Sequence, residues 1–420
     1  MDHYLYSLRA LILKKESVKK ALSFELLSQR KRLKGFNQAW QRVRLGDIAN
    51  YLTSNLSAEQ ITQQGKIKVY DVNSFIGYTN TTFISDKPYI SIVKDGSVGR
   101  VRILPPKTNI LSTMGALVAN HKTTTEFLFY LLSNFDFKNF TSGSIIPHIY
   151  FKDYKEKTIF LPPLNEQIAI ANVLSDVDHY LYSLRALILK KESVKKALSF
   201  ELLSQRKRLK GFNQAWQRVR LGDMTTSFTK QTGFDYSASI KPTLIKEQLP
   251  KYIPFIQNKD FSGHYINYET DYFIPNEIAI RFPQILLNEK CLLISIVGSI
   301  GNVAVFNHSQ DAFTGCVIAV LKFKEKKSLD FVMHFLMSAS GQKSLLNIVK
   351  ASSHKSIILA DLRDLLIPLP SLNEQITIAN ILSALDSEII SLKNKKRQFE
   401  NIKKALNHDL MSAKIRVLKK

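Results

Sequence analysis

The fold is decided by a stretch that occurs twice: LPPLNEQIAIANVLSDVD at Leu161–Asp178 and LPSLNEQITIANILSALD at Leu369–Asp386. The two copies are identical at 13 of 18 positions and lie 208 residues apart. Such an internal repeat shows that the chain is built from two related halves. The segments between the repeats, roughly 48–160 and 224–368, are unlike in sequence. The repeat therefore predicts two variable domains framed by similar helices.

Each copy opens a long stretch with the seam of a coiled coil. Apolar residues recur at alternating spacings of four and three, which places them in a narrow line along one side of a helix. The first seam consists of Ile170, Leu174, Val177, Leu181, Leu184, Ile188, Leu198 and Leu202. The second consists of Ile378, Leu382, Leu385, Ile389, Leu392, Phe399, Leu406 and Leu410. A seam this narrow forms no core alone, so the two helices are predicted to pack against each other, antiparallel.

Lysines interrupt both seams in the middle: Lys191 and Lys195 in the first, and Lys396 and Lys403 in the second. A helix of about 40 residues is roughly 60 Å long, whereas one turn of B-DNA is about 34 Å. Such a pair of helices is long enough to hold two domains more than one DNA turn apart. The sequence therefore predicts a spacer of fixed length.

A second repeat is perfect, because Asp2–Asp47 and Asp178–Asp223 are identical over 46 residues. Segment 178–207 also corresponds to 386–415, so the N-terminal helix predicted at 1–31 is a third copy where a coiled coil needs two. This helix is expected to pack as a third helix, to pair with a second molecule or to remain undocked. We hypothesise that it promotes self-association.

The net charge of +24 is concentrated in the repeated helical parts. Each copy of the perfect repeat carries eleven Lys and Arg against four Asp and Glu, and residues 387–420 carry a net +7. The segments 48–177 and 224–386 carry only +2 and +1. Basic charge located in this way indicates anionic partners, either DNA phosphates or acidic protein surfaces. The alternative is that Lys and Arg only solvate long helices.

The two variable segments share an order of signals although their sequences differ. A glycine-serine element lies between strand-like runs in both, within Lys94–Val101 and Ser295–Val303. A helix-like apolar run follows, and then a loop of small polar residues, Thr141–Ser144 or Ala351–Lys355. The glycines either let the backbone approach a phosphate closely or form a tight hairpin turn. The polar loops offer hydrogen bonds to bases or phosphates.

The only two tryptophans, Trp40 and Trp216, occupy the same place in the two copies of the perfect repeat. We interpret them first as packing anchors between helix and domain, and second as contacts to nucleic acid.

The sequence contains no recognisable catalytic pattern. Gly341–Ser344 ends like a phosphate-binding loop but lacks its first glycine, and the nine histidines show no metal-ligand spacing. Cys291 and Cys316 lie in apolar, strand-like runs and are predicted to be buried free thiols. No apolar run reaches the ~18 residues that cross a bilayer, and no signal peptide is visible after Met1. A cytoplasmic protein that recognises a partner is expected, rather than an enzyme or a membrane protein.

Taken together, these motifs resemble the specificity (S) subunit of type I restriction–modification systems. The resemblance covers nearly the whole chain from about Arg32. It is carried by Leu-Pro-x-Leu-Asn-Glu-Gln at 161 and 369, Lys-Gly-Phe…Trp…Leu-Gly-Asp at 35 and 211, and Gly-Ser-Ile/Val-Gly at 96 and 298. It implies an α+β fold: two globular α/β target-recognition domains joined by long helices in an antiparallel coiled coil, with an internal pseudo-two-fold repeat.

The resemblance also implies a division of labour along the chain. The parts are an N-terminal helix at 1–31, target-recognition domain 1 at 32–161, a central spacer at 162–207, domain 2 at 208–368 and a C-terminal spacer at 369–420. Each domain is expected to read one half of a split site in double-stranded DNA, and the coiled coil to set the gap. Two modification subunits with S-adenosylmethionine would dock on the helices, and restriction subunits that use ATP would join them. This chain itself is expected to hold no cofactor, no metal and no catalytic residue.

Residues are carried over by their place in the shared motifs. In domain 1, those expected near DNA are Gly96, Ser97, Gly99, Arg100, Arg102, Ser142, Gly143, Ser144 and His148. In domain 2, they are Gly298, Ser299, Gly301, Asn302, Ser352, Ser353, His354 and Lys355. The helix residues expected to bind partner subunits are Glu166, Gln167, Lys190, Lys191, Glu374 and Gln375. Arginine to guanine and asparagine to adenine are the expected base contacts.

Two other functions remain open from the sequence. One is a freestanding two-site DNA-binding or bridging regulator, and the other is a catalytic subunit whose motif is not recognisable. Binding to a modification subunit distinguishes the S subunit from the regulator.

Overall fold

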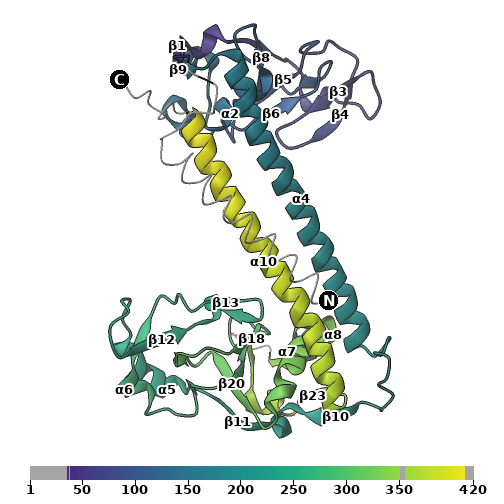
Figure 1. Ribbon diagram of the computed structural model, residues 1–420, viewed down its shortest axis with the longest axis vertical. Helices are drawn as coiled ribbons and strands as arrows, with labels where there is room; N and C mark the ends of the chain where they lie inside the picture. The colour runs from purple at the N-terminus through teal and green to yellow at the C-terminus, as the bar shows by residue number, and fades with distance from the viewer. Residues whose placement is uncertain (1–35, 37, 351–354, 412–420) are drawn as a thin grey trace. The chain divides into compact units, whose positions relative to one another are not determined.

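The computed structural model describes residue 36, residues 38–350 and residues 355–411 (Figure 1). The helix predicted at 1–31 lies outside the described residues, as do Ser352, Ser353 and His354. The chain divides into two compact units, Met1–Ala186 with Lys393–Lys420 (unit 1) and Leu187–Leu392 (unit 2).

Unit 1 is built on a four-stranded antiparallel sheet. Its strands, in sheet order, are β2 (Ala49–Thr53), β8 (Met114–Ala119), β5 (Tyr89–Val93) and β6 (Val101–Leu104). Successive side chains of a strand point to opposite faces of the sheet. Ile90 and Ile92 therefore join one core with α2 (Thr125–Ser133), while Tyr89 and Val93 join a second core on the other face.

A smaller sheet of unit 1 carries the second core. Its strands, in order, are β4 (Phe75–Thr79), β3 (Ile67–Tyr70) and β7 (Asn109–Ile110), of which β3 and β7 run parallel. Ile110 of this sheet is fully buried against Tyr89 and Val93 of the larger one.

Unit 2 repeats this plan with different side chains. Its four-stranded antiparallel sheet consists of β11 (Thr225–Lys230), β20 (Ile318–Phe323), β17 (Cys291–Ser295) and β18 (Val303–Phe306). Its second sheet consists of β15 (Phe273–Pro275), β12 (Tyr252–Ile256), β19 (Ala312–Thr314) and β16 (Leu286–Leu287). The corresponding helix is α7 (Leu329–Met337), which is followed by α8 (Ala339–Asn347).

Shorter elements complete unit 2. They are α5 (Gly233–Asp235), α6 (Asn276–Ala279), the hairpin β13–β14 (Phe261–Ser262 and Tyr265–Ile266), and the pair β21–β22 (Val349–Lys350 and Ser356–Ile357). Both cysteines are free thiols as expected, but only Cys291 is buried, so the expectation of burial was wrong for Cys316.

A short strand pair closes each domain at the point where the chain enters a long helix. In unit 1, β1 (Gln41–Arg44) pairs with β9 (Thr158–Leu161), and α3 (Phe151–Tyr154) precedes β9. In unit 2, β10 (Gln217–Arg220) pairs with β23 (Leu366–Leu369), and α9 (Leu359–Arg363) precedes β23. The register is the same, because Gln41 faces Leu161 and Gln217 faces Leu369. The first strand of each domain therefore lies beside its last.

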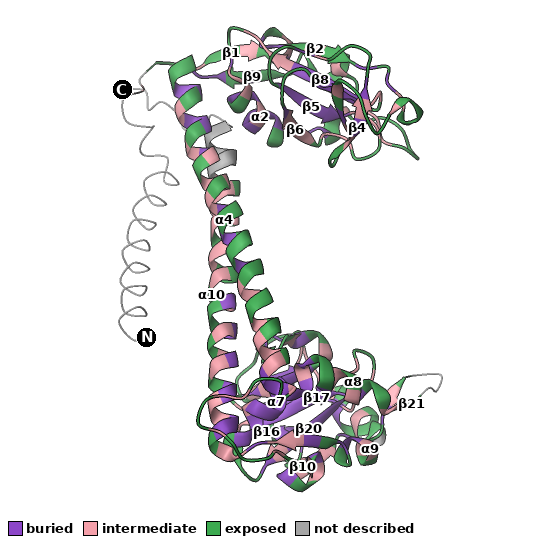
Figure 2. Ribbon diagram, turned by 90° about the vertical axis from the view of Figure 1, so that its right-hand side faces the viewer, coloured by how far each residue is buried: buried purple, intermediate pink, exposed green. Residues whose placement is uncertain are grey.

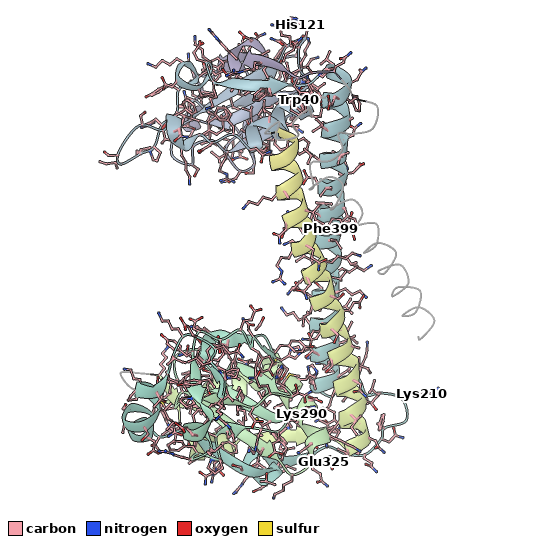
Figure 3. The ribbon with its side chains drawn as sticks, turned by 60° about the vertical axis from the view of Figure 1, so that its left-hand side comes forward. Trp40, His121, Lys210, Lys290, Glu325 and Phe399 are labelled. Carbon is pink, nitrogen blue, oxygen red and sulfur yellow. The ribbon has the colours of Figure 1, made fainter. Side chains whose placement is uncertain are left out.

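Two 40-residue helices follow these strand pairs, α4 (Leu164–Leu203) and α10 (Leu372–Met411). In unit 1 the first half of α4 packs with the last part of α10, where the rings of Tyr180 and Phe399 lie 4.4 Å apart (Figure 3). In unit 2 the second half of α4 packs with the first part of α10. The pairing is therefore antiparallel in each unit.

Burial follows the predicted seam (Figure 2). Leu174 and Leu382, which the offset of 208 relates, are fully buried, and Leu184 and Ile389 are at most 5 % exposed. The fold class predicted from the repeat is confirmed: two α/β domains, long antiparallel helices and an internal repeat.

Candidate DNA interface

The glycine-serine element of each domain is the loop of a β-hairpin. It joins β5 to β6 in unit 1 and β17 to β18 in unit 2. In both loops the two glycines have positive φ, 80° at Gly96 and Gly99, and 77° and 84° at Gly298 and Gly301. Glycine adopts this conformation without strain. Of the two interpretations left open by the sequence, the hairpin turn is the one that the structure shows.

The two glycines of the unit 1 loop have different surroundings. A Cβ added at Gly99 would lie 2.7 Å from the ring of Phe137, so this glycine lets the loop close onto the core. A Cβ at Gly96 would meet nothing within 4 Å. The backbone at Gly96 is therefore exposed, and a ligand can approach it closely. The backbone at Gly99 is packed against Phe137 instead.

A second loop is fastened to this hairpin in unit 1. His148 and Ser142 exchange backbone hydrogen bonds of 2.7 and 2.9 Å, which closes the polar loop between them. The amide of Gly96 donates to the carbonyl of Pro147 at 2.9 Å, and Nδ1 of His148 lies 2.7 Å from Oδ1 of Asp95. The residues predicted around 96 and around 142–148 thus lie on one continuous surface.

Unit 2 fastens its loops in the same way. Val297 forms a bridge with Ser356, and the amide of Ile357 donates to the carbonyl of Ile296 at 2.9 Å. The equivalent bond in unit 1 runs to Lys94 from Ile149, which the offset of 208 relates to Ile357. Lys355 follows directly on the part of this loop that lies outside the described residues, and it is exposed.

The charged and polar side chains of these loops differ in whether they are already engaged in contacts within their own unit. Arg100 is exposed, and its side chain has no hydrogen bond or ion pair to the part of the chain that the structure describes. Arg102, in contrast, donates from Nη1 to the carbonyl of Asn73 at 3.2 Å, and its guanidinium lies 5.3 Å from the Tyr70 ring centroid. Asn302 occupies the position of unit 2 that follows the second glycine, as Arg100 does in unit 1, and is exposed.

Four of the residues predicted to bind partner subunits are buried within their own units. Glu166, Gln167, Glu374 and Gln375 are at most 3 % exposed. Oε2 of Glu374 accepts from Arg208 at 2.6 Å and from the indole of Trp216 at 3.3 Å. Trp40 donates to Glu166 in the same way at 3.1 Å, at the position labelled in Figure 3.

These contacts hold the four residues within their own units, and their binding to partner subunits stays a prediction. The carboxylates are enclosed by an indole and, in unit 2, by a guanidinium as well. Gln167 likewise donates to the carbonyls of Lys122 and Pro162. We assign these side chains to fixing helix to domain, which is the role first given to the tryptophans. The exposed Lys190 remains a partner-binding prediction, as does Lys191, which pairs with Glu388 at 2.9 Å.

A polar contact that the sequence did not reveal ties each domain to the helices further along. In unit 1 the hydroxyl of Tyr130 on α2 donates to Asp178 at 3.0 Å. Burial, reinforced by Asp178, raises the pKa of this tyrosine. In unit 2 the corresponding aspartate is Asp386, which lies between Lys195 and the imidazole of His264.

Two histidines of unit 2 are buried at this contact. Nε2 of His264 lies 3.3 Å from Asp386, and Nε2 of His334 on α7 lies 2.9 Å from the hydroxyl of Ser383. Burial lowers the pKa of His264, and it lowers the pKa of His334 to about 3. Both rings are therefore neutral at pH 7. The offset of 208 relates Asp178 to Asp386, so the shared position was visible in sequence, whereas the histidine partners were not.

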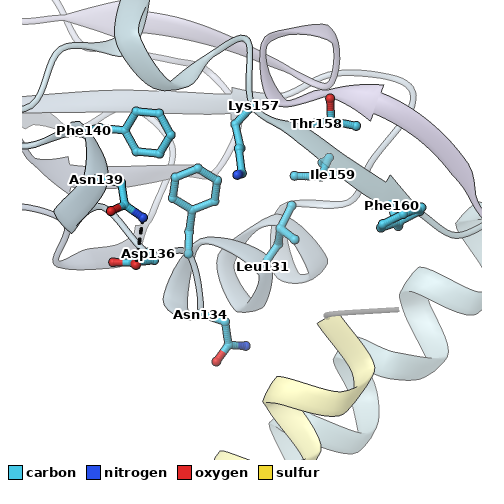
Figure 4. A pocket seen from close by; sticks show the side chains of 10 residues that line it. Leu131, Asn134, Asp136, Asn139, Phe140, Lys157, Thr158, Ile159 and Phe160 are labelled. Atoms are coloured by element: carbon cyan, nitrogen blue, oxygen red, sulfur yellow. Dashed lines mark hydrogen bonds between the residues drawn. The ribbon is translucent and has the colours of Figure 1, made fainter. Parts of the chain in front are cut away.

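A pocket of about 290 Å³ opens beside β9 in unit 1 (Figure 4). Its ionisable side chains are Asp136, which accepts from Asn139 at 3.2 Å, and Lys157. One carboxylate and one amine of this kind form no catalytic or metal-binding arrangement. Among the residues the structure describes, no group of three or more His, Cys, Asp or Glu is placed to hold a metal ion.

Within the described ranges, no helix is both long enough and apolar enough to span a bilayer.

Comparison with known proteins agrees with this arrangement. The family model described as type I restriction modification DNA specificity domain matches residues 37–211 and again residues 213–401. Two curated relatives come from Methanocaldococcus jannaschii. The type I restriction enzyme MjaVIII specificity subunit is 27% identical over 90% of this chain and 93% of its own length. The putative type I restriction enzyme MjaX specificity subunit is 28% identical over 80% of this chain and 79% of its own.

A solved structure shares the fold. The crystal structure of the S subunit of the type I restriction-modification system from M. genitalium aligns with a TM-score of 0.63 at 20% identity. The alignment covers 91% of this chain and 98% of that one. With the paired family matches, which span most of the chain, the assignment follows. The chain belongs to the family of type I restriction–modification specificity subunits, non-catalytic subunits that recognise DNA.

Proposed function

We propose that each of the two domains reads one half of a bipartite DNA site, and that α4 and α10 set the gap between the halves. The observation that carries the proposal is the repeated pair of fastened loops. Both domains hold the same hairpin and fasten the following segment to it through equivalent bonds, yet the exposed side chain after the second glycine is Arg100 in one and Asn302 in the other. A common scaffold with different exposed groups is what two different half-sites require.

Base contacts are proposed for the two exposed side chains of these hairpins. Arginine binds guanine with two hydrogen bonds and asparagine binds adenine in the same way. The backbone and hydroxyls at Gly96, Ser97, Gly298 and Ser299 are better suited to phosphate oxygens, which position a protein without reading sequence. Ser142, Gly143, Ser144 and Lys355 are proposed as further contacts of the second loops.

Assembly is proposed to use the outer faces of the helices. Two modification subunits that carry S-adenosylmethionine would bind there, and restriction subunits that use ATP would join them. The proposal is supported by large apolar side chains that α4 leaves in water, Tyr182 at 73% and Leu189 at 64% exposure, beside the exposed Lys190. Apolar patches rimmed by polar residues mark protein interaction sites.

We also propose the five-part division at 1–31, 32–161, 162–207, 208–368 and 369–420. The first part is the hypothesised self-association segment. Removing residues 2–31 is expected to lower the oligomeric mass measured by native mass spectrometry. An unchanged mass contradicts that hypothesis without affecting DNA reading.

The test of the function separates a specificity subunit from a freestanding regulator. The chain is purified alone and with a modification subunit. Each preparation is titrated with DNA that carries the site found by methylation sequencing and with DNA of scrambled sequence. We expect a stable complex with the modification subunit and sequence-specific binding by that complex. Tight, specific binding by the chain alone, with no modification subunit retained, would favour the regulator.

A further inference from the structure

The second loop of unit 1 ends in an apolar tip. Ile145 is 93% exposed and Ile146 is 54% exposed. A single apolar side chain on a protein surface is ordinary. Two adjacent isoleucines at the tip of a loop, one of them almost fully exposed, form a larger apolar surface, and the structure of the loop explains why they stay exposed.

The loop holds them in a fixed turn. Hydrogen bonds between Ser142 and His148 close its base, and the bond from Gly96 to Pro147 fastens it to the hairpin. Gly143 has a φ of 91°, and a Cβ there would lie 2.3 Å from the carbonyl oxygen of Ile146. The turn that displays the isoleucines therefore requires glycine, and the exposure of Ile145 belongs to the folded loop.

The side chains around the tip are polar or basic, which suits contact with a nucleic acid better than contact with an apolar protein surface. Ser97, Arg100 and Ser144 are all exposed on the fastened loops. The nearby carboxylate of Asp95 is held by His148 at 2.7 Å, so this negative charge is engaged within the domain. Hydroxyls and a free arginine around an apolar point suit a DNA groove, where the C5-methyl of thymine is the apolar group on the base edges of the major groove.

We propose that Ile145 contacts the C5-methyl group of a thymine in the half-site read by domain 1, and so determines the base preferred at that position. This inference rests on the proposed DNA-reading function. The residue that the offset of 208 relates to Ile145 is a serine, Ser353, so the preference would belong to domain 1 alone.

The test uses the whole complex with its modification subunits and its own site. Each thymine of the domain 1 half-site is replaced in turn by deoxyuridine, which lacks only the methyl group. One replacement is expected to weaken binding about four-fold, the factor that corresponds to the ~0.8 kcal/mol of one buried carbon group. Ile145→Ala is expected to weaken binding to thymine DNA and to bind the two DNAs equally.

Ile280→Ala provides the matched control, because Ile280 is 56% exposed in unit 2 and lies outside the loops. It should leave the difference between thymine and deoxyuridine unchanged, and both variants should keep the wild-type melting temperature. Equal weakening of both DNAs by Ile145→Ala, or no effect of any deoxyuridine, overturns the inference. Failure of the wild-type complex to bind the split site at all overturns the proposed function instead.

Discussion

Lys195 on α4 forms an ion pair with Asp386 on α10, inside the line along which the two helices meet. The same pair recurs in unit 1, where Nζ of Lys403 lies 2.5 Å from Asp178. Each residue of one pair is related to its counterpart by the offset of 208. Two of the four lysines that interrupt the seams in sequence, Lys195 and Lys403, are thus bound by aspartates of the facing helix, and these two pairs hold the antiparallel register.

The two pairs are predicted to differ in energy because they differ in burial. The side chain of Asp386 is 8% exposed, whereas that of Asp178 is 35% exposed. Asp386→Ala leaves Lys195, which is 24% exposed, without its partner and should destabilise unit 2 by roughly 2–4 kcal/mol. Lys403→Ala should cost unit 1 about 1 kcal/mol or less, since a partly exposed pair is screened by water and Asp178 keeps its bond from Tyr130.

The tryptophans allow the two units to be followed separately in that experiment. With Trp40 replaced by Phe, fluorescence during denaturant unfolding reports Trp216 in unit 2, and the reverse replacement reports unit 1. Equal losses of stability from Asp386→Ala and Lys403→Ala would contradict the predicted difference in energy between the two pairs.

Acid is predicted to destabilise unit 2 through His334. Its pKa in the folded protein is about 3, compared with an ordinary value of 6.5. Between these values the unfolded chain binds a proton that the folded chain does not. The free energy of unfolding therefore falls as the pH falls from 6.5 towards 3, by up to about 1.4 kcal/mol per unit.

His334→Gln removes that titration while keeping an amide that can bond to Ser383. Its unfolding midpoint, followed through Trp216, should depend less on pH below 6.5 than that of the wild type. Identical pH dependence in the two proteins would show that His334 does not carry the effect.

The assignment of Glu374 to fixing the helix on domain 2 leads to a separate prediction. Glu374→Gln weakens the acceptor for Arg208 and Trp216 and should destabilise unit 2 by about 1–3 kcal/mol. At a temperature where the variant is folded, it should still bind the modification subunit with wild-type affinity. Lys190→Ala is the opposite case, with unchanged stability and weakened binding. A folded Glu374→Gln chain that fails to bind would support the partner role.

Arg100 is predicted to contact a base, whereas Arg102 is predicted to stabilise the fold of unit 1. Arg100→Ala should cost about 1–3 kcal/mol of DNA binding and relax the preference at one base pair. Arg102→Ala removes the contact with Tyr70 and should lower the stability of unit 1 by roughly 0.5–1 kcal/mol, with the target sequence unchanged. Binding of the two variants to a panel of single-base changes decides between these roles.

The sequence predicts those features of the fold that follow from a regular spacing or from the internal repeat, and it does not predict contacts between residues distant in the chain. Leu174 and Leu382 could be placed in the seam because spacing alone defines a helix face, and the offset of 208 gave the domain plan. The burial of Glu166 and Glu374 could not be predicted, because burial of a polar residue depends on partners distant in sequence, here Trp40, Trp216 and Arg208. The contact between His264 and Asp386 could not be found, since His264 reaches Asp386 from the turn of the β13–β14 hairpin, which is distant in sequence. Arg102 could not be separated from Arg100, because its contacts with Tyr70 and with the carbonyl of Asn73 appear only in the structure.

The spacer is tested by removing the same 14 residues from both helices. Deleting 180–193 and 388–401 keeps both aspartate–lysine pairs, the seven-residue repeat and the antiparallel register. At 1.5 Å per residue the spacer loses about 21 Å, or roughly six base pairs. Methylation sequencing of cells that express the variant with the modification subunit should show the original half-sites separated by a shorter gap. The original gap would contradict the spacer.

The most direct measurement is methylation sequencing of cells that express this chain with its modification subunit, compared with cells that express that subunit alone. The account predicts methylation that depends on this chain, at a motif of two short specified sequences separated by a fixed unspecified gap. Exchanging Gly96–Arg102 and Ser142–His148 for the equivalent loops of another family member should change one half and leave the other intact. A single uninterrupted motif, or a change in both halves, would contradict it.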